Sequence, residues 1–129
     1  MWNWSGCRVV VTGGAGFFGR VVCAKLKERG CAFLAVPRRA DFDLTKQSDV
    51  ERLYQEARPD VVLHLAADVG GIGANRSHPG RFFYSNLAMG LHLIEQARIH
   101  GIRKFVQVGT VCAYPKFTPV PFTETDLWN

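Results

Sequence analysis

Hydrophobic and polar positions along this chain follow two alternating patterns. Four short, almost continuous apolar runs are typical of strands buried on both faces, and they span residues 8–12, 31–36, 60–66 and 104–109. Between them, apolar residues recur every three or four positions. This spacing predicts helices over 17–29 and 79–100 and another that opens at a Ser48-x-x-Glu51 capping box. A weaker run predicts a further short strand over 40–44.

Each predicted helix carries an apolar stripe that we expect to be buried. The stripe of the first helix consists of Phe18, Val21, Val22 and Leu26, and that of the second of Val50, Leu53, Tyr54 and Ala57. In the last helix the stripe consists of Phe83, Leu87, Leu91, Ile94 and Ala97. Gly30 and Gly101 stand where glycine commonly ends a helix.

The order of these elements predicts one α/β domain over residues 1–129. Strands that alternate with helices indicate parallel βαβ units. We expect a Rossmann-type doubly wound parallel sheet of about five strands, in the order 3-2-1-4-5. Ligands bind such sheets beyond the carboxyl ends of the strands. The candidate site is therefore formed by the glycine turn and by residues 36–39, 66–75 and 109–116.

The glycine turn is the most informative segment of the sequence. Residues 9–19 read Val-Val-Val-Thr-Gly-Gly-Ala-Gly-Phe-Phe-Gly, a strand that runs into glycines at the start of a predicted helix. Such a turn presents backbone N–H groups and the positive end of a helix dipole to a pyrophosphate. It predicts a dinucleotide site, and the alternative is a glycine-rich turn without a ligand.

Two arginines follow the second predicted strand, where an NAD-selective fold usually offers a carboxylate to the ribose. Arg38 and Arg39 instead supply guanidinium groups that suit a 2′-phosphate. We therefore expect NADP rather than NAD as the cofactor, unless both arginines only form a solvated turn. Asp41 and Asp43 stay possible contacts to the ribose or adenine.

Composition narrows the classes of partner. The chain has 16 basic and 11 acidic residues, a formal net charge of +5, but its basic residues are scattered. This pattern favours anionic small molecules over nucleic acid. No run approaches the roughly 20 apolar residues of a membrane helix, and no signal peptide is recognisable, so we expect a cytoplasmic protein without a membrane partner. The four cysteines show no metal-ligand or disulfide spacing, so we expect no metal site and mostly buried thiols.

Several motifs together resemble the extended short-chain dehydrogenase/reductase family of nucleotide-sugar enzymes, the NAD-dependent epimerase/dehydratases. The glycine turn, Asp43-Leu44 and the His-Leu-Ala-Ala run at 64–67 carry the family resemblance. The Gly-Gly-Ile-Gly-Ala-Asn run at 70–75 and the Cys-Ala-Tyr-Pro-Lys run at 112–116 resemble the subgroup of GDP-L-fucose synthases. Enzymes of that subgroup convert GDP-4-keto-6-deoxy-mannose to GDP-L-fucose with NADPH, by 3,5-epimerisation and 4-keto reduction.

The resemblance assigns expected roles to particular residues. The cofactor-binding set would be Gly13, Gly16, Phe17, Phe18, Gly19, Arg38, Arg39, Asp43, Leu44, Leu65, Ala66 and Ala67. Thr110 would donate its hydroxyl to the keto oxygen of the sugar, where negative charge develops during hydride delivery. Cys112 would act as an acid or base in epimerisation, against the alternative of a packed thiol. The resemblance further implies a GDP-sugar substrate and a homodimer for the full-length enzyme.

Two departures from the family pattern change what we expect of this chain. Asp68 stands where a basic or neutral residue is more usual. The family's Tyr-x-x-x-Lys pair would lie beyond Asn129, as would a catalytic His, further strands and most of the sugar-nucleotide domain. Tyr54, Tyr84 and Tyr114 have no Lys four residues later. We therefore expect no meaningful turnover and an open apolar edge at 104–109 that causes self-association.

Two other functions stay open at this point. The chain could belong to another NAD(P)-dependent nucleotide-sugar epimerase or dehydratase, or be a non-catalytic NADP-binding module.

His64 lies within an apolar run, where a core histidine with a hydrogen-bond partner is expected.

Overall fold

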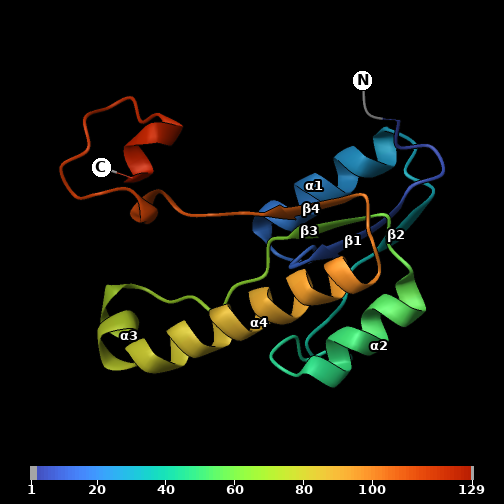
Figure 1. Cartoon of the computed structure of the whole chain (residues 1–129), viewed down its shortest axis with the longest axis horizontal. Helices are drawn as coiled ribbons and strands as arrows, with labels where there is room; N and C mark the ends of the chain where they lie inside the picture. The colour runs from blue at the N-terminus through green and yellow to red at the C-terminus, as the bar shows by residue number, and fades with distance from the viewer. Residues whose placement is uncertain (1–2, 129) are drawn as a thin grey trace.

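The computed structural model describes residues 3–128 and shows a four-stranded parallel sheet with helices on both faces (Figure 1). The strands are β1 (Arg8–Thr12), β2 (Phe33–Ala35), β3 (Val61–His64) and β4 (Lys104–Gln107). The helices are α1 (Phe17–Glu28), α2 (Gln47–Ala57), α3 (Ile72–Ser77) and α4 (Pro79–Ile99). The strand order β2-β1-β3-β4 is the predicted order without its third strand, and it confirms the doubly wound architecture.

The central strand β1 is buried because helices cover both of its faces. Val9 and Val11 pack with Cys23 and Leu26 of α1 on one face of the sheet. Val10 points to the other face, where it packs into the cluster made by α2 and α4. In Figure 1, α1 lies on one side of the strands and α2 and α4 lie on the other. A strand covered on both faces needs apolar residues at successive positions, which explains the run at 9–11.

The additional strand predicted over 40–44 is wrong. The backbone N–H groups of Asp41 and Phe42 both donate to the carbonyl of Arg38, so the chain turns here instead of extending along the sheet. Leu44 is buried and Phe42 half-buried against the α2/α4 cluster. Their apolar character therefore reflects packing of a loop and not strand pairing.

The capping box at Ser48 is also wrong, because the N-cap of α2 is Lys46, two residues earlier, and the helix begins at Gln47. No side chain caps this terminus. Glu51 instead accepts a hydrogen bond from Gln47, and Asp49 accepts one from the backbone N–H of Asp43 at 2.9 Å. The first turn of α2 is thus used to hold the preceding loop.

The stripe predicted to be buried on α4 is mostly exposed. Phe83, Leu87, Leu91 and Ile94 are each more than half exposed, whereas Ala97 is buried as predicted. The buried residues of α4 are instead Phe82, Met89, Leu93, Gln96 and Ala97, of which Met89, Leu93 and Ala97 pack in the core cluster with α2. Helix α4 is apolar on two faces, and spacing cannot say which face meets the sheet. In α1, Leu26 is buried and Val22 is half-buried, but Phe18 and Val21 are exposed.

The segment after β4 continues past the carboxyl ends of the strands (Figure 1). It contains two 3-10 turns, at Val111–Ala113 and Glu124–Trp128, and the rings of Tyr114 and Phe122 stack 4.6 Å apart. The short helix α3 occupies the glycine-rich stretch after β3, where the periodicity of apolar residues predicts no helix. Within residues 3–128, none of the helices combines the length and apolar character needed to cross a bilayer.

Candidate functional site

A cavity of about 290 Å³ opens at the carboxyl ends of β1, β2 and β3. This is the edge at which a doubly wound sheet binds ligands, beside the point where the chain connections diverge to opposite faces. Four segments form its wall: the glycine turn, the loop after β2, the loop after β3, and one face of α4. The lining residues are Gly13, Ala15, Pro37, Arg38, Arg39, Phe42, Asp43, Leu44, Thr45, Ala66, Ala67, Asp68, Ser85 and Met89.

The glycine turn brings backbone atoms closer together than side chains would allow. Gly13 has a positive φ of 70°, and a Cβ added there would lie 2.7 Å from the backbone nitrogen of Ala66. A Cβ at Gly19 would overlap the carbonyl oxygen of Gly13. These two glycines are therefore required for the start of α1 to pack against the loop after β3.

The amino terminus of α1 fits an anionic group. Gly16 is its N-cap, has no side chain to satisfy the free N–H groups, and is followed by a first turn without an acidic residue. Unsatisfied N–H groups and the helix dipole together favour a phosphate at such a terminus. Phe17 and Phe18 begin the helix and are 88% and 55% exposed, so they leave this end open.

The loop after β2 supplies both positive and negative charge to the cavity. Arg38 and Arg39 are exposed at its rim. The carboxylate of Asp43 accepts hydrogen bonds from the hydroxyl of Thr45 at 2.8 Å and from its backbone N–H at 3.2 Å. These bonds, with the charges of Arg39 and Lys46, hold the pKa of Asp43 below its usual value. Asp43 is therefore ionised and fixed beside the arginines.

A buried hydrogen-bond network joins the ends of β1 and β3 beneath the cavity. The hydroxyl of Thr12 lies 2.6 Å from Nδ1 of His64 and accepts a hydrogen bond of 3.3 Å from the backbone N–H of Ala66. Thr12 and His64 are 0% and 2% exposed. Burial lowers the pKa of His64, so its ring is neutral at pH 7. The expectation of a core histidine with a partner is confirmed.

The structure brings together much of the predicted cofactor-binding set. Arg38, Arg39, Asp43, Leu44, Ala66 and Ala67 line the cavity with Gly13, and Gly16 and Gly19 complete the adjoining turn. The remaining three do not line the cavity: Phe17 and Phe18 lie exposed at the start of α1, and the side chain of Leu65 packs into the core cluster beneath α1. Sequence reasoning missed Ser85 and Met89, which reach the cavity from α4. The residues of α4 that face the cavity are set by the way the helix crosses the sheet. No local feature of the sequence predicts that crossing.

Thr110 and Cys112 lie together beyond the carboxyl end of β4. The hydroxyl of Thr110 accepts a hydrogen bond of 3.2 Å from the backbone N–H of Cys112. Both residues are exposed, so the alternative of a packed thiol at Cys112 is wrong. Of the other cysteines, Cys7 and Cys23 are buried and Cys31 is intermediate. No group of His, Cys, Asp or Glu within the described residues could hold a metal ion.

Comparison with known proteins identifies the family. A model of the NAD dependent epimerase/dehydratase family matches residues 9–128. The chain belongs to this family. The match begins in β1 and includes the glycine turn, the arginine loop and Thr110 and Cys112, so the whole of the site described above lies within it.

Curated relatives of this family member include GDP-L-fucose synthases. GDP-L-fucose synthase 1 of Arabidopsis thaliana is 38% identical over 120 residues, which cover 93% of this chain and 37% of the relative. GDP-L-fucose synthase of Escherichia coli is 32% identical over 120 residues, again 93% of this chain and 37% of the relative. The chain thus spans less than two fifths of the length of these relatives.

Solved structures of related proteins share the fold. A GDP-mannoheptose C4 reductase from Campylobacter jejuni with NADP bound aligns with a TM-score of 0.88 at 26% identity, over 99% of this chain and 40% of that one. A GDP-L-fucose synthetase from Naegleria fowleri bound to NADP aligns with a TM-score of 0.83 at 29% identity, over 93% of this chain and 36% of that one. Both neighbours contain NADP.

Proposed function

We propose that this chain is the NADP-binding part of a nucleotide-sugar epimerase/reductase of the GDP-L-fucose synthase type. The observation that carries the proposal is the cavity in which the glycine turn, the open terminus of α1 and two arginines meet. Its support is the similarity to relatives named GDP-L-fucose synthase and to structures with NADP bound.

The charges around the cavity favour NADP over NAD. A pyrophosphate at the amino terminus of α1 would meet backbone N–H groups, and Arg38 and Arg39 would meet the 2′-phosphate. Each charge-assisted hydrogen bond of this kind contributes roughly 1.5–3 kcal/mol. Asp43, already bonded to Thr45 through one carboxylate oxygen, would lie with Leu44 beside the adenine.

In this proposal Thr110 and Cys112 act on the sugar. NADPH, when bound, would supply the hydride for reduction of the 4-keto carbon. Thr110 would donate its hydroxyl proton to the keto oxygen in a hydrogen bond that strengthens as charge develops. Cys112 would remove and return the proton on the carbon next to the carbonyl. Both side chains are exposed at the edge of the sheet where the cofactor cavity opens, in keeping with contact to a substrate.

The proposed full-length enzyme is a homodimer that acts on a GDP-sugar. The exposed apolar stripe of α4, made of Phe83, Leu87, Leu91 and Ile94, supports a protein interface, since large exposed apolar patches commonly mark one. A cytoplasmic location stays a prediction.

Two alternatives differ from this proposal in their chemistry. Another nucleotide-sugar epimerase or dehydratase would share the cofactor cavity but act on a different sugar. A non-catalytic module would bind NADP(H) alone. A Tyr-x-x-x-Lys pair in the same reading frame, downstream of residue 129, would favour an enzyme over the module.

The proposal is tested by calorimetric titration of the chain with NADPH and with NADH. We expect saturable binding of NADPH, weaker binding of NADH, and loss of both in Gly16→Val, whose side chain would intrude on the turn 3.2 Å from the carbonyl oxygen of Gly13. Gly71→Val is the matched control, because Gly71 falls within the predicted segment 66–75 but does not line the cavity. Gly71 is also a helix N-cap with nearly the same backbone angles, but open space surrounds its Cβ position.

The two variants separate a failure of the site from a failure of the fold. Gly71→Val should bind NADPH as the unmodified chain does, and both variants should keep the far-UV circular dichroism of the α/β fold. If the unmodified chain binds neither cofactor, the proposal fails. If Gly16→Val binds as tightly as the unmodified chain, the glycine turn is not the phosphate site.

A further inference from the structure

Asp68 places a fixed negative charge on the wall of the cavity. It follows Ala67 in the loop after β3, and its side chain is only 18% exposed. The side-chain amide of Asn86 on α4 holds the backbone of Asp68 by two hydrogen bonds. It accepts one from the N–H of Asp68 at 2.9 Å and donates one to the carbonyl of Asp68 at 2.8 Å. The same amide nitrogen is 2.8 Å from the carbonyl of Phe82. This anchoring keeps the Asp68 carboxylate beside the cavity.

Arg81 pairs with this carboxylate from the first turns of α4. Its Nε and Nη2 donate to the two carboxylate oxygens of Asp68, each at 3.2 Å. The guanidinium also lies over the ring of Phe82, 5.4 Å from its centroid. Arg81 is therefore held in place by two contacts, although its side chain is 61% exposed.

Helix stability does not explain an arginine at this position. The helix dipole disfavours cations near an amino terminus, and Arg81 follows Pro79, the first residue of α4, by only two positions. An ion pair with one exposed partner also contributes little to folding. The pair is better explained by its effect on the electrostatic potential of the cavity that Asp68 lines.

An unpaired carboxylate in that wall would oppose a dinucleotide. The pyrophosphate of NAD(P)H is anionic, and a 2′-phosphate adds about 1.5 to 2 further negative charges at pH 7. Repulsion between the carboxylate and one cofactor charge about 10 Å away, at an effective dielectric constant between about 40 and 80, would weaken cofactor binding roughly two- to fourfold. The penalty grows with ligand charge, so NADPH would lose more affinity than NADH.

We propose that Arg81 is a positioning residue for cofactor binding, which acts by cancelling the charge of Asp68 on the cavity wall. Because Arg81 acts through Asp68, it needs no contact with the cofactor. This inference rests on the proposed NADP-binding function. It also accounts for an acidic residue at position 68, where a basic or neutral one is expected from the family resemblance.

The test is a double-mutant cycle on the chain, with dissociation constants measured by calorimetry at low salt. We expect Arg81→Gln to weaken NADH binding at least about two- to fourfold and NADPH binding several times more, because NADPH carries more negative charge. Asp68→Asn should bind NADPH at least as tightly as the unmodified chain. In the Asp68→Asn background, Arg81→Gln should have a smaller effect, because the exposed guanidinium is then no longer held beside the cavity by the Asp68 carboxylate.

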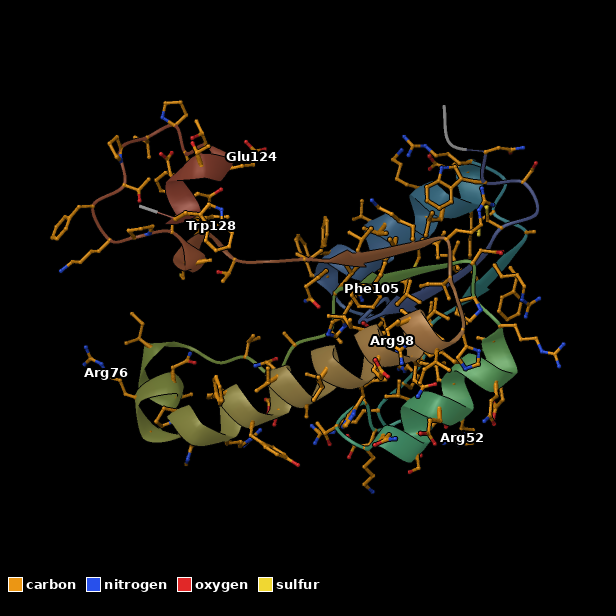
Figure 2. The ribbon with its side chains drawn as sticks, in the orientation of Figure 1. Arg52, Arg76, Arg98, Phe105, Glu124 and Trp128 are labelled. Atoms are coloured by element: carbon orange, nitrogen blue, oxygen red, sulfur yellow. The ribbon has the colours of Figure 1, made fainter. Side chains whose placement is uncertain are left out.

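Two controls separate an electrostatic role from a structural one. The loss in Arg81→Gln should shrink at about 0.5 M KCl, where screening shortens the range of the Asp68 charge to a few ångströms. Arg98→Gln is the matched substitution. Arg98 lies on the same helix (Figure 2) and pairs with Glu95. The helical rise separates it from Arg81 by about 25 Å along the axis, so we expect Arg98→Gln to leave both dissociation constants unchanged.

Several results would overturn the inference. Equal, salt-independent losses for NADPH and NADH would mean that Arg81 supports the fold of the site. An equally large loss in the Asp68→Asn background would mean that Arg81 acts on the cofactor independently of Asp68. No change in Arg81→Gln would remove its role altogether. If the unmodified chain binds neither cofactor, the proposed function fails and this inference fails with it, a result distinct from the other three.

Discussion

Replacement of Thr12 by valine is the sharpest test of how this fold holds its ligand edge. Valine has nearly the same shape as threonine and is more apolar, so packing alone predicts little loss of stability, or a gain. The structure predicts the opposite. The Thr12 hydroxyl is fully buried and bonds to both Nδ1 of His64 and the N–H of Ala66. Thr12→Val would leave both of these groups without a partner.

The expected loss can be estimated from these two hydrogen bonds. A buried polar group left unsatisfied costs about 1–3 kcal/mol. The Ala66 bond, at 3.3 Å, is long and belongs at the lower end of that range, whereas the His64 bond, at 2.6 Å, is short. We expect Thr12→Val to lower the free energy of unfolding by about 2–4 kcal/mol. Thr12→Ser keeps the hydroxyl and loses one methyl group, which costs about 1 kcal/mol.

The assay is urea unfolding followed by far-UV circular dichroism, with both variants measured beside the unmodified chain. The order of stability should be unmodified chain, then Thr12→Ser, then Thr12→Val. A Thr12→Val variant as stable as Thr12→Ser would refute the reasoning, because packing and not hydrogen bonding would then decide the stability of this site.

Three further outcomes are expected. Burial lowers the pKa of His64 below 6.5 in the folded chain, so the unfolded chain takes up a proton first as the pH falls. The free energy of unfolding should therefore decline between about pH 6.5 and pH 5.5, by no more than about 1.4 kcal/mol per pH unit. Urea unfolding at several pH values checks this, and His64→Gln should show a smaller slope; an unchanged slope would contradict the assignment. Arg38→Ala combined with Arg39→Ala should raise the dissociation constant for NADPH by at least about 10- to 150-fold, the contribution of one charge-assisted hydrogen bond, and that for NADH less than threefold. Equal effects on both would argue against 2′-phosphate recognition. The 129-residue chain should bind NADPH but not oxidise it with a GDP-4-keto-sugar, since it lacks the family's Tyr-x-x-x-Lys pair and loss of general acid catalysis costs about 10²–10⁴ in rate. NADPH consumption followed at 340 nm would reveal any turnover.

The order and kind of elements in this protein follow from local properties of the sequence. The run at Val9–Val11 demands a strand with both faces covered, and the glycines at 13, 16 and 19 demand a tight turn into a helix. Both requirements act within a few residues, through backbone conformation and the period of apolar positions. The strand order and most of the cavity lining could therefore be predicted.

Tertiary structure decided what lies between the elements. Phe42 and Leu44 have strand-like character but pack as a loop, because the N–H groups of Asp41 and Phe42 bond to Arg38 instead of to a neighbouring strand. On α4, two faces are apolar, and only contact with the sheet and α2 selects Leu93 over Leu91 for burial. The same choice turns Ser85 and Met89 to the cavity.

The position of Asp68 combines both kinds of information. The sequence by itself determined that a carboxylate follows the strand at the ligand edge. Only the tertiary structure set its partner, since Arg81 stands 13 residues away and reaches it across the loop and α3. Local sequence fixes backbone conformation because its forces act between near neighbours. Charge pairing and helix rotation depend on contacts that exist only after the chain has packed.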